Sequence, residues 1–89
     1  MPPRFAMGQL VATPGALEVI PGGNFWPYIK RHLEGDWGDI SPEDKAENEL
    51  SLREGFRLLS AYTLPNGCKI WIITEADRSA TTILLPEEY

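Results

Sequence analysis

The pattern of hydrophobic and polar positions changes character near residue 56. Before that point, apolar side chains recur three and seven positions apart, which is the spacing of one helix face. After it, they gather in short runs rich in β-branched and aromatic residues, a composition typical of strands. The pattern predicts a single α+β domain over residues 1–89, in which two or three short helices pack on one face of a C-terminal antiparallel sheet.

Two helices are predicted from a capping residue followed by proline. In Thr13-Pro14 and again in Ser41-Pro42, a hydroxyl can cap the helix and proline occupies the first helical position. The first helix is short, because Pro21-Gly22-Gly23 interrupts it. The second is expected to run to about Glu54 and to stop at Gly55, since glycine accepts the left-handed conformation of a C-cap.

A further helix is predicted between these two, over residues 25–34. Asn24 is its expected N-cap, and Trp26, Ile29 and Leu33 form an apolar stripe along one face. We therefore expect Trp26 to lie in the core.

The second half of the chain predicts a three-stranded antiparallel meander. Its strands cover residues 56–64, 68–74 and 81–85, and residues 5–12 form a candidate fourth strand at the N-terminus. Asn66-Gly67 separates the first two strands, and Asn-Gly favours a type I′ turn with positive φ at both central residues.

This turn sets the expected pairing of the hairpin. With Asn66 and Gly67 as a two-residue loop, Tyr62 lies opposite Trp71. The two aromatic rings would then be cross-strand neighbours on one face of the sheet.

Length and charge limit the classes of function. A chain of 89 residues builds one modest core. Its net charge of −5 disfavours direct binding to nucleic acids or to anionic membranes, and it favours a partner protein with a basic surface. The lone Cys68 forms no intramolecular disulfide, and the N-terminus does not resemble a signal peptide, so we expect a cytoplasmic protein.

Acidic residues concentrate between residues 34 and 54. This stretch carries eight acidic residues against Lys45 and Arg53, a charge of −6 in a chain whose total is −5. Such a run is either a solvated helix face or a negative patch that docks on a basic surface. Trp37 lies in a loop and either plugs the core or anchors a partner. The candidate partner-binding residues are Asp36, Trp37, Asp39, Glu43, Asp44, Glu47 and Glu49.

A polar loop joins the last two predicted strands. Glu75, Asp77, Arg78 and Ser79 place two carboxylates, a guanidinium and a hydroxyl close together. The loop is either a small recognition or acid–base site or a turn held by an Asp–Arg pair and a serine hydrogen bond. In the enzyme alternative, a small ribonuclease or toxin-like protein, Glu75 is the base, Arg78 the phosphate clamp and His32 the acid.

The residue inventory argues against metal or cofactor chemistry. His32 and Cys68 are single residues of their types, too few for a structural zinc site, and the acidic residues lack the spacing of a calcium loop. The chain contains no phosphate-binding loop and no dinucleotide fingerprint. We therefore expect no metal, no cofactor and no catalytic set.

Five segments carry a family resemblance: Gly35–Asp39 and Thr74–Ser79 are the most specific, with Val11–Leu17, Arg57–Tyr62 and Leu84–Tyr89 beside them. Together they resemble a family of short bacterial proteins carried on plasmids and integrative elements, usually labelled plasmid-related or, loosely, a type I restriction subunit. The chain departs from this family between Glu18 and Lys30, in a stretch that is more helical there. The restriction label does not transfer, because a methyltransferase needs a glycine-rich pocket and a base-flipping site.

The resemblance implies a location on mobile elements and not a mechanism. Together with the acidic patch, it leads to the hypothesis of a non-catalytic accessory protein that binds another protein. The expected partner class is a nucleic-acid-binding host-defence protein, inhibited in the manner of an anti-CRISPR or anti-restriction factor. The alternatives are the ribonuclease-like enzyme and a structural or regulatory subunit that dimerises by strand addition at the edge of its hairpin.

Overall fold

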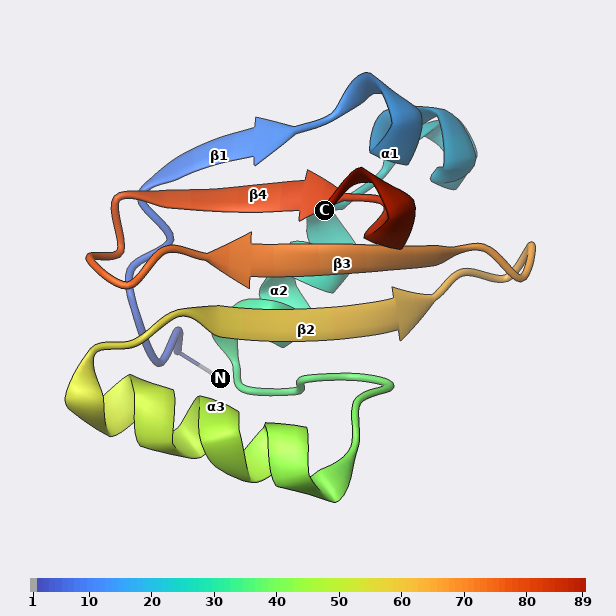
Figure 1. The fold of residues 1–89 in the computed structure, drawn as a ribbon. Coiled ribbons are helices and arrows are strands. Elements are labelled where there is room, and N and C mark those ends of the chain that lie inside the picture. Colours follow the sequence, from blue (N-terminus) through green and yellow to red (C-terminus); the bar gives the residue numbers. More distant parts are fainter. Residues whose placement is uncertain (1) are drawn as a thin grey trace.

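The computed structural model describes residues 2–89, which form a four-stranded sheet with three α-helices (Figure 1). The strands are β1 (Gln9–Ala12), β2 (Leu58–Thr63), β3 (Lys69–Thr74) and β4 (Ala80–Leu84). The helices are α1 (Pro14–Val19), α2 (Trp26–Leu33) and α3 (Pro42–Glu54). Two short 3-10 helices, η1 (Pro21–Gly23) and η2 (Pro86–Glu88), follow α1 and β4.

The sheet has the strand order β1-β4-β3-β2. The strands β2, β3 and β4 form an antiparallel meander, and β1 joins β4 in parallel. In Figure 1, α2 crosses behind the sheet, α1 lies at the end of β1, and α3 runs along the outer side of β2. The predicted α+β fold, with its meander and N-terminal fourth strand, is confirmed.

The core lies between the sheet and the helices α1 and α2. Alternate residues of each strand point to this side, as the period of two in a strand requires. These side chains meet the inner faces of α1 and α2, and the buried cluster consists of Ala16, Ile20, Ile29, Leu33, Tyr62, Leu64, Ile70, Ile72 and Ile83.

The predicted helix caps are confirmed for α1 and α3. The Thr13 hydroxyl accepts from the Ala16 amide and the Ser41 hydroxyl from the Asp44 amide, each at 3.1 Å. Gly55 ends α3 with φ of 80°, the left-handed conformation that glycine adopts without strain. None of the helices in residues 2–89 has the length and apolar character needed to cross a membrane.

Helix α2 differs from its prediction at the first turn. The N-cap position belongs to Phe25 and has no side-chain cap, so the expectation for Asn24 is wrong. Trp26 is 52% exposed, and its expected place in the core is also wrong. The buried face of α2 includes His32 beside Ile29 and Leu33, which turns that face away from Trp26.

The hairpin pairing differs from the predicted one by one residue. Tyr62 pairs with Ile70, so Tyr62 faces the core while Trp71 lies on the opposite face. Pro65 occupies the second position of a turn in which the Gly67 amide donates to the Leu64 carbonyl at 2.9 Å. Positive φ is confined to Gly67 within this turn, so the type I′ geometry does not form and the connection is longer than two residues.

Candidate functional site

Helix α3 is fixed to the sheet through a side chain at its middle. The amide of the buried Asn48 donates to the Leu59 carbonyl at 2.7 Å, and its oxygen accepts from the Leu59 amide at 3.1 Å. This side chain therefore pairs with β2 as a neighbouring strand would. Near the end of α3, Nη2 of Arg78 donates to the Ser51 carbonyl at 3.0 Å. The helix is thus held at two points.

Glu49 of α3 is committed to contacts within the molecule. Arg4 binds both of its carboxylate oxygens, at 2.8 and 3.0 Å, and the Trp37 indole donates to it at 3.0 Å. The guanidinium of Arg4 and the indole hold the pKa of this carboxyl below its ordinary value. Glu49 therefore offers little charge to a partner.

The two aspartates before α3 also have internal partners. Arg31 donates to Asp36 at 2.7 Å and lowers the pKa of its carboxyl. Asp39 accepts from the Thr63 hydroxyl at 2.7 Å, at the outer edge of β2. Both side chains stay exposed, but their geometry is set by these contacts.

Four carboxylates on α3 remain turned to solvent: Glu43, Asp44, Glu47 and, in the last turn, Glu54. The first three lie together near the start of the helix. Their positions i, i+1 and i+4 share one side of the helix, and we call this set the α3 acidic face. In the described part of the chain no ion pair engages any of them. The α3 acidic face is therefore an uncompensated negative patch on a helix with a fixed position.

Trp37 is a core plug. Its side chain is 4% exposed, and its ring stacks with Phe5 at 6.3 Å between centroids. The backbone on either side of it joins β2, because the Trp37 carbonyl accepts from the Ala61 amide and the Asp39 amide donates to the Ala61 carbonyl. A partner cannot use this indole as an anchor in the folded protein.

The polar loop between β3 and β4 is organised as a turn around Arg78. This residue has φ of 62°, and its Nη1 donates to the carbonyls of Phe56, Glu75 and Ala76 at 2.7 to 3.1 Å. The Ser79 hydroxyl and amide lower the pKa of the Asp77 carboxyl. The guanidinium of Arg78 is therefore occupied by backbone carbonyls, while Glu75 lies at the surface.

His32 is completely buried between α2 and the sheet. Its Nδ1 lies 2.5 Å from the Ser60 hydroxyl and its Nε2 2.9 Å from the Thr74 hydroxyl. Thr74 lies 2.8 Å from the Thr81 hydroxyl, which donates to the Met7 carbonyl at 2.8 Å. These contacts form one hydrogen-bonded chain that crosses the sheet.

The end of this chain fixes the tautomer of the histidine. The single hydroxyl proton of Thr81 goes to a carbonyl, so Thr81 accepts from Thr74, and Thr74 must accept from His32. The neutral imidazole therefore carries its proton on Nε2 and accepts from Ser60 at Nδ1. Burial, followed by the positive charge of Arg78, lowers the pKa of His32 to about 3.

These placements bear on the enzyme alternative. His32 is buried and neutral, and the partly exposed Arg78 has its guanidinium bound to backbone carbonyls, so neither is available beside Glu75 as acid and clamp. Cys68 is half-buried, and no group of three or more potential metal ligands occurs within residues 2–89. Among residues 2–89, His32, Arg78 and Glu75 are therefore not arranged as the catalytic set that this alternative requires.

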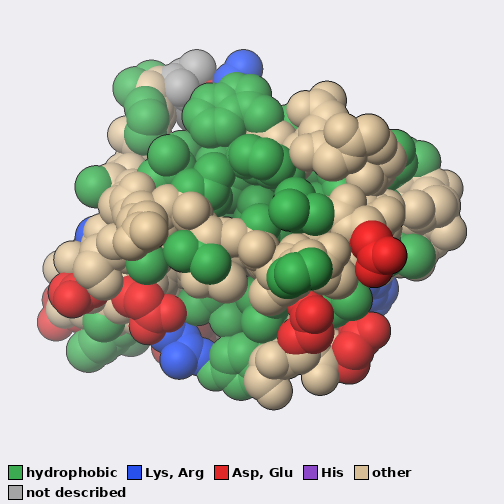
Figure 2. Space-filling model, turned by 90° about the horizontal axis from the view of Figure 1, so that it is seen from above, with side chains coloured by type: hydrophobic (Ala, Val, Ile, Leu, Met, Phe, Trp, Pro, Cys, Tyr) green, Lys and Arg blue, Asp and Glu red, His purple; other side chains and the backbone are tan. Residues whose placement is uncertain are grey.

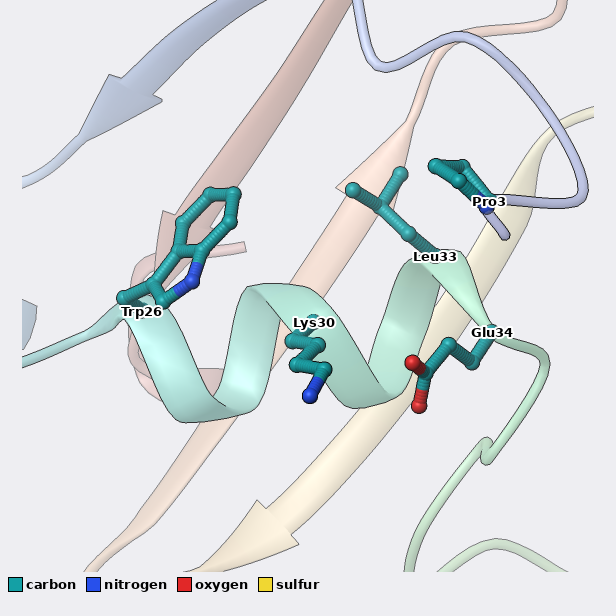
Figure 3. Close-up of a pocket in the computed structure, with 5 residues that line it drawn as sticks. All are labelled: Pro3, Trp26, Lys30, Leu33 and Glu34. Atoms are coloured by element: carbon teal, nitrogen blue, oxygen red, sulfur yellow. The ribbon is translucent and has the colours of Figure 1, made fainter. Parts of the chain in front are cut away.

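A shallow pocket of about 290 Å³ lies on the outer side of α2. Figure 3 shows the Trp26 and Leu33 side chains along the helix with Pro3 opposite Leu33, while Lys30 and Glu34 lie along its other side. Its lining is mostly apolar and includes no buried titratable group. Trp26 therefore forms one wall of a surface depression, and the pocket gives its exposure no further role.

Sequence reasoning missed the residues that hold the site in place. Asn48 stands in a polar helix, and only its position opposite β2 reveals its role. Arg4 lies 45 positions before the carboxylate that it binds. Comparison of the chain with protein-family models, with curated proteins and with solved structures finds no match in any of the three.

Proposed function

We propose that this chain is a small non-catalytic accessory protein that binds a basic surface of another protein through the α3 acidic face. The supporting observation is the contrast among its carboxylates. Glu49 and Asp36 are neutralised by arginines of the same chain, whereas no ion pair within residues 2–89 engages Glu43, Asp44 or Glu47. Carboxylates without an internal ion pair attract a basic partner at long range. When the partner binds, no ion pair among the described residues has to break.

The attachment of α3 adds to this argument. Asn48 and Arg78 hold the helix against the sheet, so the three carboxylates keep a constant spacing before binding. A preorganised surface avoids part of the entropy cost of association. Trp37 has no part in the proposed interface because it is buried, and Asp36 has none because Arg31 already pairs with it. The exposed Asp39 contributes at the margin of the interface.

The partner class follows from the charge. A protein whose basic surface normally holds nucleic acid matches a negative helix face, and the chain itself is not expected to bind nucleic acid. In the mobile-element setting implied by the family resemblance, such a partner is a host-defence nuclease or its DNA-binding subunit. The proposed outcome of binding is inhibition by occupation of that surface.

A charge-reversal experiment tests the proposal. The variant Glu43→Lys, Asp44→Lys, Glu47→Lys is compared with a control that reverses three exposed carboxylates elsewhere, at Glu18, Glu75 and Glu87. Both variants change the net charge equally, so only the position of the charge differs. Each protein is immobilised and used to capture nucleic-acid-binding proteins from a bacterial lysate at low and high salt.

We expect a partner that is captured by the wild type and by the control, released by salt and displaced by duplex DNA. The α3 variant should bind it roughly tenfold or more weakly, the loss typical of several interfacial charges. Equal capture by the α3 variant, or capture that is indifferent to salt, contradicts the proposal. The purified protein should leave RNA intact, and cleavage that depends on Glu75 would instead support the ribonuclease alternative.

A further inference from the structure

The two edge strands of the sheet, β2 and β1, differ in whether their outward backbone groups are hydrogen-bonded. On β2, Asn48 bonds both backbone groups of Leu59, and the segment from Trp37 to Asp39 bonds both backbone groups of Ala61. Gly38 makes this close approach possible, because a Cβ at that position would collide with the Ala61 carbonyl. Strand addition at the edge of the hairpin, one of the sequence-based alternatives, is therefore blocked on β2.

The other edge, β1, carries backbone groups that point away from the sheet. Gln9 donates to the Ser79 carbonyl and Thr13 to the Ile83 carbonyl, so the odd-numbered residues bond β4. In a regular parallel ladder the backbone N–H and C=O groups of the intervening residues point away from the neighbouring strand. Here these are the backbone groups of Leu10 and Ala12. We call these outward groups, together with the Val11 side chain, the β1 edge.

The β1 edge lacks the devices that usually protect an exposed strand. Gln9–Ala12 contains no charged residue, no proline and no bulge. Val11 is 42% exposed, and Leu17 of α1 is 39% exposed at the same end of the molecule. Figure 2 looks down on β1 and α1 and shows hydrophobic side chains gathered across this side, with acidic and basic groups towards its margin.

We propose that a second copy of this chain occupies the β1 edge, forming a two-fold dimer with one continuous eight-stranded sheet. The strands run antiparallel with Val11 opposite its own counterpart, so that Leu10 of each chain pairs with Ala12 of the other. This pairing supplies backbone hydrogen bonds to the outward groups and buries the two Val11 side chains against each other. It rests on no part of the α3 proposal.

An uncharged edge strand is matched by a strand of the same character, and a second β1 is such a strand. The charge on α3 does not oppose this pairing. The acidic helix α3 flanks β2, at the far edge of the sheet (Figure 1). With strands about 4.8 Å apart, the two β2 strands of the dimer lie about 34 Å from each other, beyond the Debye length of roughly 8–10 Å. The α3 charges of the two copies therefore add little repulsion at β1. Glu88, whose carboxylate accepts from the Thr13 hydroxyl at 2.7 Å just after β1, adds some at the two ends of the pairing.

Sedimentation equilibrium tests the dimer directly. Because the paired segment is short, we expect weak association, with the weight-average mass rising from 10.0 kDa towards twice that value as concentration increases. Val11→Lys should abolish the rise, since it buries two like charges at the centre of the pairing. The control Ala46→Lys changes the net charge equally on exposed α3 and should dimerise like the wild type.

A cross-link identifies the pairing. In a Cys68→Ser background, Val11→Cys should form a disulfide dimer under mild oxidation, because opposite Cα atoms in such a pair lie about 4.5 Å apart. The control Thr63→Cys, exposed on β2, should stay monomeric. A wild-type chain that remains at 10.0 kDa up to about 1 mM, a dimer that survives Val11→Lys, or equal cross-linking of both cysteine variants would overturn the inference.

Discussion

Mild acid should destabilise this protein through one buried side chain, His32. The folded protein holds its imidazole neutral, with Nε2–H donating to Thr74 and Nδ1 accepting from Ser60. Burial and the nearby Arg78 lower its pKa from 6.5 to about 3. In the unfolded chain the same imidazole is hydrated and returns to the ordinary value.

The sign and size of the effect follow from proton linkage. Below pH 6.5 the unfolded chain binds a proton that the folded protein refuses until about pH 3, so acidification favours unfolding. One proton changes the free energy of unfolding by about 1.4 kcal/mol per pH unit. Between pH 7.5 and pH 5 the protein should therefore lose roughly 2 kcal/mol, a large share of the 5–15 kcal/mol that is usual for a small domain.

Urea unfolding at pH 7.5 and pH 5, followed by tryptophan fluorescence, measures this loss. The window lies above the pKa values of ordinary carboxyl groups, which therefore contribute little. The variant His32→Gln has no titrating group at this position, so its stability should be lower overall but nearly constant between the two pH values. Because the chain has one histidine, its NMR signals report the tautomer and the pKa without ambiguity. A folded-state imidazole that titrates near pH 6.5, or an equal loss in the variant, would refute the reasoning.

Two further substitutions test how α3 and its leading loop are attached. Asn48→Ala removes both hydrogen bonds to Leu59 and should cost about 2–3 kcal/mol, a fall in melting temperature of roughly 10–20 °C by calorimetry. A fall of only a few degrees would mean that water replaces the amide. Gly38→Ala should cost about 3 kcal/mol or more, because its Cβ meets the Ala61 carbonyl and the Tyr62 ring, whereas Gly55→Ala, with positive φ and open space, should cost about 1 kcal/mol. Similar losses in Gly38→Ala and Gly55→Ala would show that φ alone, and not the collision, sets the cost.

The local parts of the fold could be predicted from the sequence. Thr13, Ser41 and Gly55 act on groups within four residues of themselves, so their neighbours in the chain are enough to identify them. The meander was predictable for the same reason, since its strands are joined by short connections. The exposure of the α3 carboxylates was also evident, because the charged side chains of a polar helix lie in solvent.

The errors arose where distant segments decide the outcome. The turn residues suggested a two-residue loop. The observed pairing of Tyr62 with Ile70 places Tyr62 on the core face, and this register leaves a longer turn between the strands. Trp26 fitted an apolar stripe, but the pairing of His32 with hydroxyls on the sheet rotated the buried face of α2. Asn48 looked like any polar helix residue until β2 was placed opposite it.

The guanidinium of Arg78 has a practical consequence for anyone who labels or engineers this protein. It joins the end of α3 to the β3–β4 turn through the carbonyls of Ser51, Phe56 and Glu75. An epitope or fluorophore inserted into that turn would loosen α3, although the two are far apart in the chain, and the weaker binding would mimic the loss of a binding residue on α3. In the turn between β2 and β3, Gly67 has open space around it, so a reporter there leaves α3 in place provided that the bond from the Asn66 side-chain amide to the Val19 carbonyl is kept.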